Sequence, residues 1–242
     1  MNYVLKATNL SKDYKKFKAL NNLTMSIPKG SIYGLVGKNG AGKTTLIRLI
    51  CGLQSPTTGD LELYETNWND SSISEKRKKL GGIVETPSIY LDMTAEDNLK
   101  QQYYILGMSS FEGIKELLIL VGLDQSGTKK AKNFSLGMRQ RLGIAVALCG
   151  NPEFLVLDEP INGLDPQGII EIRELILKLT RERNITVLIS SHVLDELARI
   201  ATNYGFLDKG QIIKEMSAEE LENSCRKCIH LKVTDTKILG NV

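Results

Sequence analysis

The stretch from Gly37 to Thr45 carries residue types that bind phosphate, in the order Gly, four intervening residues, then Gly-Lys-Thr. Glycines let the backbone N–H groups close around an oxyanion, because the chain can adopt dihedral angles that a Cβ would forbid. We expect the Lys43 ammonium to neutralise the β- and γ-phosphates and the Thr44 hydroxyl to hold Mg²⁺. The residues predicted to surround the phosphates are Gly37, Lys38, Asn39, Gly40, Ala41, Gly42, Lys43, Thr44 and Thr45.

The segments on either side of this loop have the required strand and helix patterns. The apolar run Ile32–Val36 precedes it, and apolar residues at helical spacing follow it from Leu46 to Ile50. A helix that starts at about Gly42 would direct its free N–H groups and positive dipole end at the same anion. The alternative is a glycine-rich turn without a ligand.

Two adjacent carboxylates, Asp158 and Glu159, follow the wholly apolar run Phe154–Leu157. Such a run suits a central parallel strand that is buried on both faces. Ligands of open α/β sheets bind at the carboxyl ends of the strands, which is where these two acids would lie. We expect Asp158 to help hold Mg²⁺ and Glu159 to orient and deprotonate the attacking water. The alternative is two solvated acids at a strand exit.

A histidine and a tyrosine complete the candidate site. His192 follows the apolar run Ile185–Ser190, just as the two carboxylates follow the run before them. We therefore expect it near the γ-phosphate. The alternative is a histidine with a structural role only. Tyr14 precedes the phosphate loop and could offer a face on which a purine stacks. Equally, it could be a turn tyrosine that packs on its own hairpin.

The composition is that of an ordinary globular protein. The chain has 242 residues, of which 42% are hydrophobic and 24% are charged, and its net charge is +3. This charge gives no reason to expect nucleic acid as a partner. With no apolar run of membrane-spanning length and no signal peptide, we expect a soluble, intracellular protein. Cys225 and Cys228 have half of a zinc spacing, but further ligands are missing.

The order of the patterns predicts an α/β protein, with a P-loop NTPase core built on a mainly parallel sheet. Alternating apolar and polar residues before the phosphate loop predict antiparallel strands. Helical periodicity runs from Leu91 to about Gly122, and Thr94 can cap a helix there with Asp97. We interpret the segment at about 87–143 as a helical insertion. We expect one ATPase domain over 1–222, and a tail over 223–242 that could begin a longer extension.

Taken together, these residues resemble the ATP-binding cassette family, specifically the ATPase subunit of an ABC transporter. The discriminating segment is Asn133–Arg141, which is similar to the family's LSGGQ signature and the helix after it. The resemblance implies a head-to-tail dimer in which Ser135 and Gly137 of one copy contact the ATP bound by the other. It also implies a D-loop role for Asp165, adenine stacking by Tyr14 and a switch role for His192.

The resemblance further implies ATP and Mg²⁺ as cofactors, a second nucleotide-binding domain, and a separate transmembrane permease. The chain would then be cytoplasmic and peripheral on the inner face of the cell membrane. Two departures from the family pattern are Glu85 in place of glutamine, and Leu136 and Met138 in the signature. Glu85 can still ligate Mg²⁺, but it cannot donate an amide hydrogen bond. Both departures resemble cassettes that export peptide antibiotics such as bacitracin and lantibiotics, or protect against them.

Two other functions compete with the transporter ATPase. A soluble cassette protein acting on ribosomes or DNA-repair substrates would usually carry two cassettes or a long coiled-coil insertion. A P-loop kinase for a small molecule is disfavoured by the signature-like segment.

Overall fold

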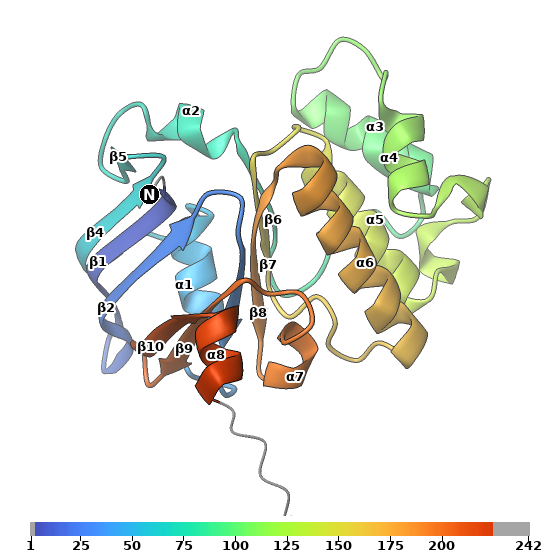
Figure 1. The fold of residues 1–242 in the computed structure, drawn as a ribbon. Coiled ribbons are helices and arrows are strands. Elements are labelled where there is room, and N and C mark those ends of the chain that lie inside the picture. Colours follow the sequence, from blue (N-terminus) through green and yellow to red (C-terminus); the bar gives the residue numbers. More distant parts are fainter. Residues whose placement is uncertain (1–2, 225–242) are drawn as a thin grey trace, which may run out of the picture.

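The computed structural model describes residues 3–224, which form two β-sheets with helices around them (Figure 1). The strands are β1 Tyr3–Tyr14, β2 Phe17–Pro28, β3 Ile32–Val36, β4 Thr58–Leu63, β5 Thr66–Asn67, β6 Leu80–Ile83, β7 Phe154–Leu157, β8 Thr186–Ser191, β9 Asn203–Asp208 and β10 Gln211–Ser217. The helices are α1 Lys43–Ile50, α2 Ile73–Arg77, α3 Ala95–Ile105, α4 Ile114–Leu120, α5 Leu136–Leu148, α6 Pro166–Arg183, α7 Leu194–Leu197 and α8 Ala218–Ser224.

The larger sheet has the order β10-β9-β3-β8-β7-β6, and all its pairs are parallel except β9 with β10. Strand β7 is central and buried throughout, as its wholly apolar sequence predicts. Phe154 and Val156 pack in one hydrophobic core, whereas Leu155 and Leu157 pack in the other. The sheet therefore separates two cores, and the prediction of a mainly parallel α/β fold is confirmed.

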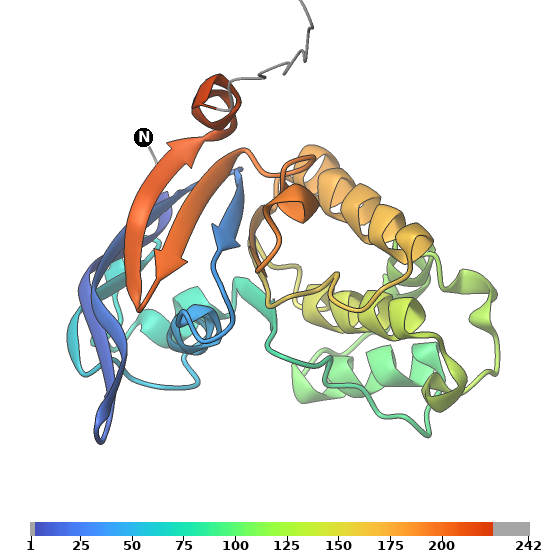
Figure 2. The same cartoon turned by 90° about the horizontal axis from the view of Figure 1, so that it is seen from below.

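The smaller sheet is antiparallel, with the order β2-β1-β4-β5, as the alternating pattern before the phosphate loop predicts. Both ribbon views place α1 between this sheet and the larger one (Figures 1 and 2). The apolar residues Leu46 and Ile47 of α1 are completely buried in the core that the two sheets share. This packing fixes the position of the loop that precedes α1.

The other face of the large sheet is covered by helices, and α3, α4 and α5 pack together on that side (Figure 2). Helix α3 begins as predicted, because the Thr94 hydroxyl accepts a hydrogen bond of 3.1 Å from the Asp97 backbone N–H. Helix α5 begins at the signature-like segment, and α6 begins after Asp165.

The apolar residues that begin at Leu80 continue to Val84, but strand β6 ends at Ile83. Glu85 has a left-handed backbone with φ of 62°, which does not continue a strand. The tail beyond Ser224, with Cys225 and Cys228, lies outside the described residues. Within residues 3–224, no helix combines the length and apolar character needed to cross a membrane.

Candidate functional site

The predicted phosphate loop connects β3 to α1, and close backbone packing holds it in place. Gly42 is the N-cap of α1 with φ of 112°, and a Cβ on it would lie 2.7 Å from the Ala19 carbonyl oxygen. A Cβ on Gly37 would lie 2.5 Å from the Leu207 carbonyl oxygen. Because both contacts are with backbone atoms, only glycine fits at these two positions.

The Lys43 side chain is buried, and its ammonium lies at the centre of the loop. It donates hydrogen bonds to the carbonyl oxygens of Gly37 and Lys38, at 2.5 and 3.3 Å. Its Nζ also lies 3.1 Å from Glu159 Oε1. The loop therefore holds a positive charge at the point where phosphates are expected to bind.

Asp158 is buried at the carboxyl end of β7, and hydroxyl groups satisfy both of its oxygens. Thr44 Oγ1 donates to one oxygen at 2.8 Å, and Ser190 Oγ donates to the other at 2.7 Å. The sequence prediction thus correctly places Thr44 beside Asp158, but it missed Ser190. Burial and the negative charge of Asp158 also raise the pKa of the nearby Cys51 thiol to about 12.

Thr44 and Asp158 supply the hard oxygen ligands that suit Mg²⁺. Within residues 3–224, no group of three or more His, Cys, Asp or Glu side chains could hold a metal ion. This arrangement fits a metal that is bound by few protein oxygens together with nucleotide phosphates, as is usual for Mg²⁺.

Glu159 contacts both Lys43 and His192. Its Oε2 lies 2.8 Å from His192 Nδ1, and its backbone N–H donates to Ser190 Oγ at 2.9 Å. Glu159 Oε1 is buried and accepts no hydrogen bond, although it forms the ion pair with Lys43. The backbone of Glu159 is left-handed, with φ of 48°, a conformation that non-glycine residues adopt at a cost. The ends of β7 and β8 thus bring Glu159 and His192 together, as the sequence predicts.

A concavity of about 290 Å³ opens over the phosphate loop. Its lining combines the loop with residues from β2 and from the segment after β7: Phe17, Ala19, Asn39, Gly40, Gly42, Lys43, Thr44, Thr45, Glu159 and Asn162. Phe17 and Asn162 were missed by the sequence analysis. Phe17 could have been identified from its place opposite Tyr14 in a predicted hairpin, but no motif marks Asn162.

Tyr14 does not line this concavity. Its hydroxyl donates to Gln54 Oε1, and the Lys12 ammonium lies 5.3 Å from the centre of its ring. The hairpin therefore directs Tyr14 towards the segment after α1.

Ser135, Gly137 and Asp165 also lie outside the lining of the concavity. Ser135 is the N-cap of α5, and its hydroxyl accepts from the Met138 backbone N–H at 3.2 Å. The Asp165 carboxylate caps α6 by accepting from the Gly168 N–H at 3.1 Å. Both polar side chains are thus occupied at helix starts within the single chain.

Glu85, predicted to bind the metal, forms an ion pair with Arg48 of α1. Glu85 does not line the concavity that contains Thr44. The Arg48 side chain is 35% exposed and the Glu85 side chain is 57% exposed, so the pair lies at the surface.

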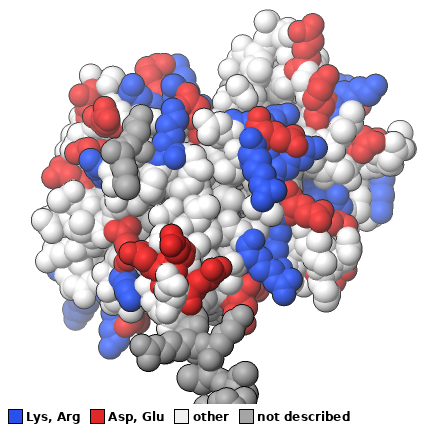
Figure 3. All heavy atoms as spheres, in the orientation of Figure 1, with Lys and Arg blue, Asp and Glu red and all other residues white. Residues whose placement is uncertain are grey.

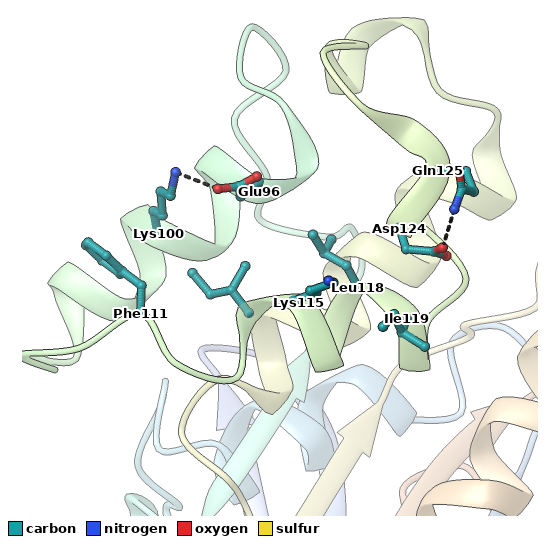
Figure 4. A pocket seen from close by; sticks show the side chains of 9 residues that line it. Glu96, Lys100, Phe111, Lys115, Leu118, Ile119, Asp124 and Gln125 are labelled. Carbon is teal, nitrogen blue, oxygen red and sulfur yellow. Dashed lines mark hydrogen bonds and ion pairs between the residues drawn. The ribbon is translucent and has the colours of Figure 1, made fainter.

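A larger cavity, of about 480 Å³, lies between α3 and α4, far from the phosphate loop in sequence (Figure 4). In its lining, Lys100 Nζ lies 2.6 Å from Glu96 Oε1, and the Gln125 amide donates to Asp124 at 2.7 Å. This cavity has no constellation resembling that of the phosphate loop. On the face shown in Figure 3, basic and acidic side chains are interspersed without a large basic patch.

Comparison with known proteins identifies the family. The family described as ABC transporter matches residues 20–162. This chain belongs to the ABC transporter family. It is 42% identical to the bacitracin transport ATP-binding protein BcrA of Enterococcus faecalis, over 100% of this chain and 78% of that protein. It is 44% identical to the lantibiotic transport ATP-binding protein SrtF of Streptococcus pyogenes, over 91% of this chain and 93% of the relative.

Solved structures support the same assignment. The ATP-binding cassette MJ0796, in a dimeric post-hydrolysis state bound to ADP and Pi, has a TM-score of 0.78 and 27% identity over 88% of this chain and 98% of that chain. The chain is therefore an ATP-binding, ATP-hydrolysing subunit of an ABC transporter. The alternative of a cassette that acts on ribosomes or DNA is not supported.

Proposed function

We propose that this ABC transporter subunit powers a separate membrane permease that exports, or protects against, peptide antibiotics of the bacitracin or lantibiotic type. We choose this substrate class because the chain is 42% identical to a relative named for bacitracin transport and 44% identical to one named for lantibiotic transport. Peptide-antibiotic cassettes are also the subgroup that Glu85 and Met138 resemble.

We assign the roles in ATP hydrolysis from the geometry of the loop. Lys43 binds the β- and γ-phosphates, because its buried ammonium is already fixed among loop carbonyl oxygens. Glu159 acts as the base for the attacking water. His192, 2.8 Å from Glu159, orients that carboxylate and would contact the γ-phosphate. The backbone N–H groups of the loop and of α1 stabilise the phosphate charge.

Thr44 and Asp158 would hold Mg²⁺ together with the nucleotide phosphates. When bound, the metal would neutralise charge on the phosphates. Ser190 orients Asp158 through the hydrogen bond of 2.7 Å. Glu85 could join this group only after its ion pair with Arg48 separates.

We further propose the assembly in which the subunit works. Residues 1–222 form the ATPase domain, with the helical subdomain at about 87–143 inserted in it. A second nucleotide-binding domain contributes Ser135, Gly137 and Asp165 to the ATP of its partner. The chain lies on the cytoplasmic side of the membrane, bound to the permease, and takes no nucleic-acid partner.

The variant Glu159→Gln tests the assignment of the base. Glutamine keeps the size of the side chain but cannot accept the proton of the attacking water. ATP binding should persist, whereas the steady-state rate of phosphate release should fall by at least about a hundredfold. Hydrolysis near the wild-type rate would refute the role of Glu159. Ser110→Ala, in the loop between α3 and α4, is the matched control and should hydrolyse ATP normally.

Affinity capture from the membrane tests the transport proposal. The tagged wild-type chain, purified from detergent-solubilised native membranes, should bring a polytopic membrane protein with it. After reconstitution into lipid vesicles, this complex should hydrolyse ATP faster when bacitracin or a lantibiotic is added. Recovery of ribosomes without a membrane protein would refute the permease, and a complex insensitive to both peptides would refute the substrate class.

A further inference from the structure

The turn between β8 and α7 carries His192, and a buried serine anchors this turn. The Ser191 hydroxyl donates a hydrogen bond of 2.6 Å to Glu196 Oε2. The same hydroxyl accepts a hydrogen bond of 3.0 Å from the Val193 backbone N–H. Because Ser191 and Val193 flank His192, these two bonds fix the backbone on both sides of the histidine.

Glu196 connects this turn to a second element of the fold. It lies in α7, a helix of only 4 residues whose first turn has no side-chain cap. A helix this short gains little stability of its own, so contacts with its neighbours fix its position. The Glu196 carbonyl oxygen accepts a hydrogen bond of 3.1 Å from Arg173 Nε of α6. Glu196 is therefore bonded to Ser191 through its side chain and to α6 through its backbone.

The direction of the His192 side chain depends on the backbone of this turn. The side chain is 34% exposed, and its Nδ1 lies 2.8 Å from Glu159 Oε2. A ring exposed to this extent has fewer packing contacts than a core side chain, so the backbone that carries it has a large effect on its position. Neither Ser191 nor Glu196 lines the concavity over the phosphate loop. These two residues can therefore affect hydrolysis only through the groups that they position.

We propose that Glu196 is a positioning residue for His192. Its hydrogen bond with Ser191 holds the turn in the conformation that directs the imidazole at Glu159. The proposal rests on the role of His192 in ATP hydrolysis and adds the residue that places it. Glu196 acts here as a hydrogen-bond acceptor, and its charge is not required. A glutamine, whose amide oxygen also accepts, should therefore replace it, whereas alanine should not.

Steady-state phosphate release by variants of this turn tests the proposal. Glu196→Ala should lower kcat about tenfold, because a small displacement of a catalytic group has a large effect on rate. Its KM for ATP should stay within about twofold of the wild-type value, since binding is not affected. Glu196→Gln should hydrolyse ATP at close to the wild-type rate. Ser191→Ala should resemble Glu196→Ala, and the double variant should be no slower than either, because both changes remove the same hydrogen bond.

Asp195→Ala removes the neighbouring, exposed acid of α7 and is the matched control, which should hydrolyse ATP normally. Equal losses in Glu196→Gln and Glu196→Ala would overturn the proposal, because the charge would then be needed and not the hydrogen bond. So would a normal kcat in Glu196→Ala when His192→Ala is slow. Loss of ADP affinity along with kcat in Glu196→Ala would show a purely structural role instead. Normal hydrolysis by His192→Ala would refute the role of His192 itself.

Discussion

At the scale of single residues, the ion pair between Arg48 and Glu85 bears on whether Glu85 can bind Mg²⁺. The family usually has glutamine at this position. In the structure, Arg48 forms an ion pair with Glu85, whereas Thr44 donates a hydrogen bond to Asp158. A carboxylate is a better Mg²⁺ ligand than an amide, but it must first leave its cationic partner. We therefore expect Arg48 and the metal to compete for Glu85.

This competition predicts opposite effects of two substitutions on the Mg²⁺ concentration that gives half-maximal ATP hydrolysis. Glu85→Ala should raise it on the order of tenfold, as loss of a group that supports a metal does. Arg48→Ala should lower it, because the carboxylate is released. Since the ion pair is exposed, neither change should alter the free energy of unfolding by more than about 1 kcal/mol. The double variant should behave like Glu85→Ala, and an unchanged Mg²⁺ dependence in Glu85→Ala would exclude a metal role.

The sequence predicts best those residues that belong to a short local motif or follow a buried strand. Lys43 and Thr44 follow from the glycine pattern, while Glu159 and His192 follow from the ends of buried strands. The structure brings these groups together, and their roles remain proposals. Ser190 and Arg48 could not be assigned from local order, because the partner of each lies more than thirty residues away in the chain.

At the scale of elements, apolar patterns predicted which strands and helices exist, whereas backbone conformation decided where they end. The run Phe154–Leu157 has no polar residue, and β7 accordingly has both faces buried. Helical periodicity from Leu91 to Gly122 is divided between α3 and α4, which are separated by a loop containing Gly107 and Gly113 with φ of 69° and 93°. Glycine tolerates such angles, so the loop between the two helices could be predicted in part from these glycines.

The end of β6 could not be predicted in this way. The apolar residues continue beyond Ile83 to Val84, yet the left-handed conformation of Glu85 takes the chain out of the sheet. A carboxylate residue gives no local signal for positive φ. The side chain of this residue forms an ion pair with Arg48 in α1, a contact that local sequence does not indicate.

At the scale of the whole molecule, the residues that we propose for the ATP site lie in two separate places on the single chain. Lys43 and Glu159 line the concavity, whereas Ser135 and Gly137 at the start of α5 do not. A second copy in a head-to-tail arrangement would place the start of its α5 over this concavity, and a two-fold axis would complete both sites at once. We therefore expect two copies of this chain to dimerise when ATP is bound.

The substitution Gly137→Arg tests this dimer without disturbing the single chain. A Cβ on Gly137 would approach other atoms no closer than 3.8 Å, so the monomer has room for a side chain that a closely apposed second copy would not accommodate. In light scattering after size-exclusion chromatography with ATP, Glu159→Gln should elute as a dimer because it retains unhydrolysed nucleotide. Glu159→Gln with Gly137→Arg should remain monomeric, although each monomer should still bind ADP. The combination of Glu159→Gln with Ser110→Arg, on the exposed loop between α3 and α4, should dimerise normally. Dimers that persist with Gly137→Arg would place the interface elsewhere and separate α5 from the ATP site.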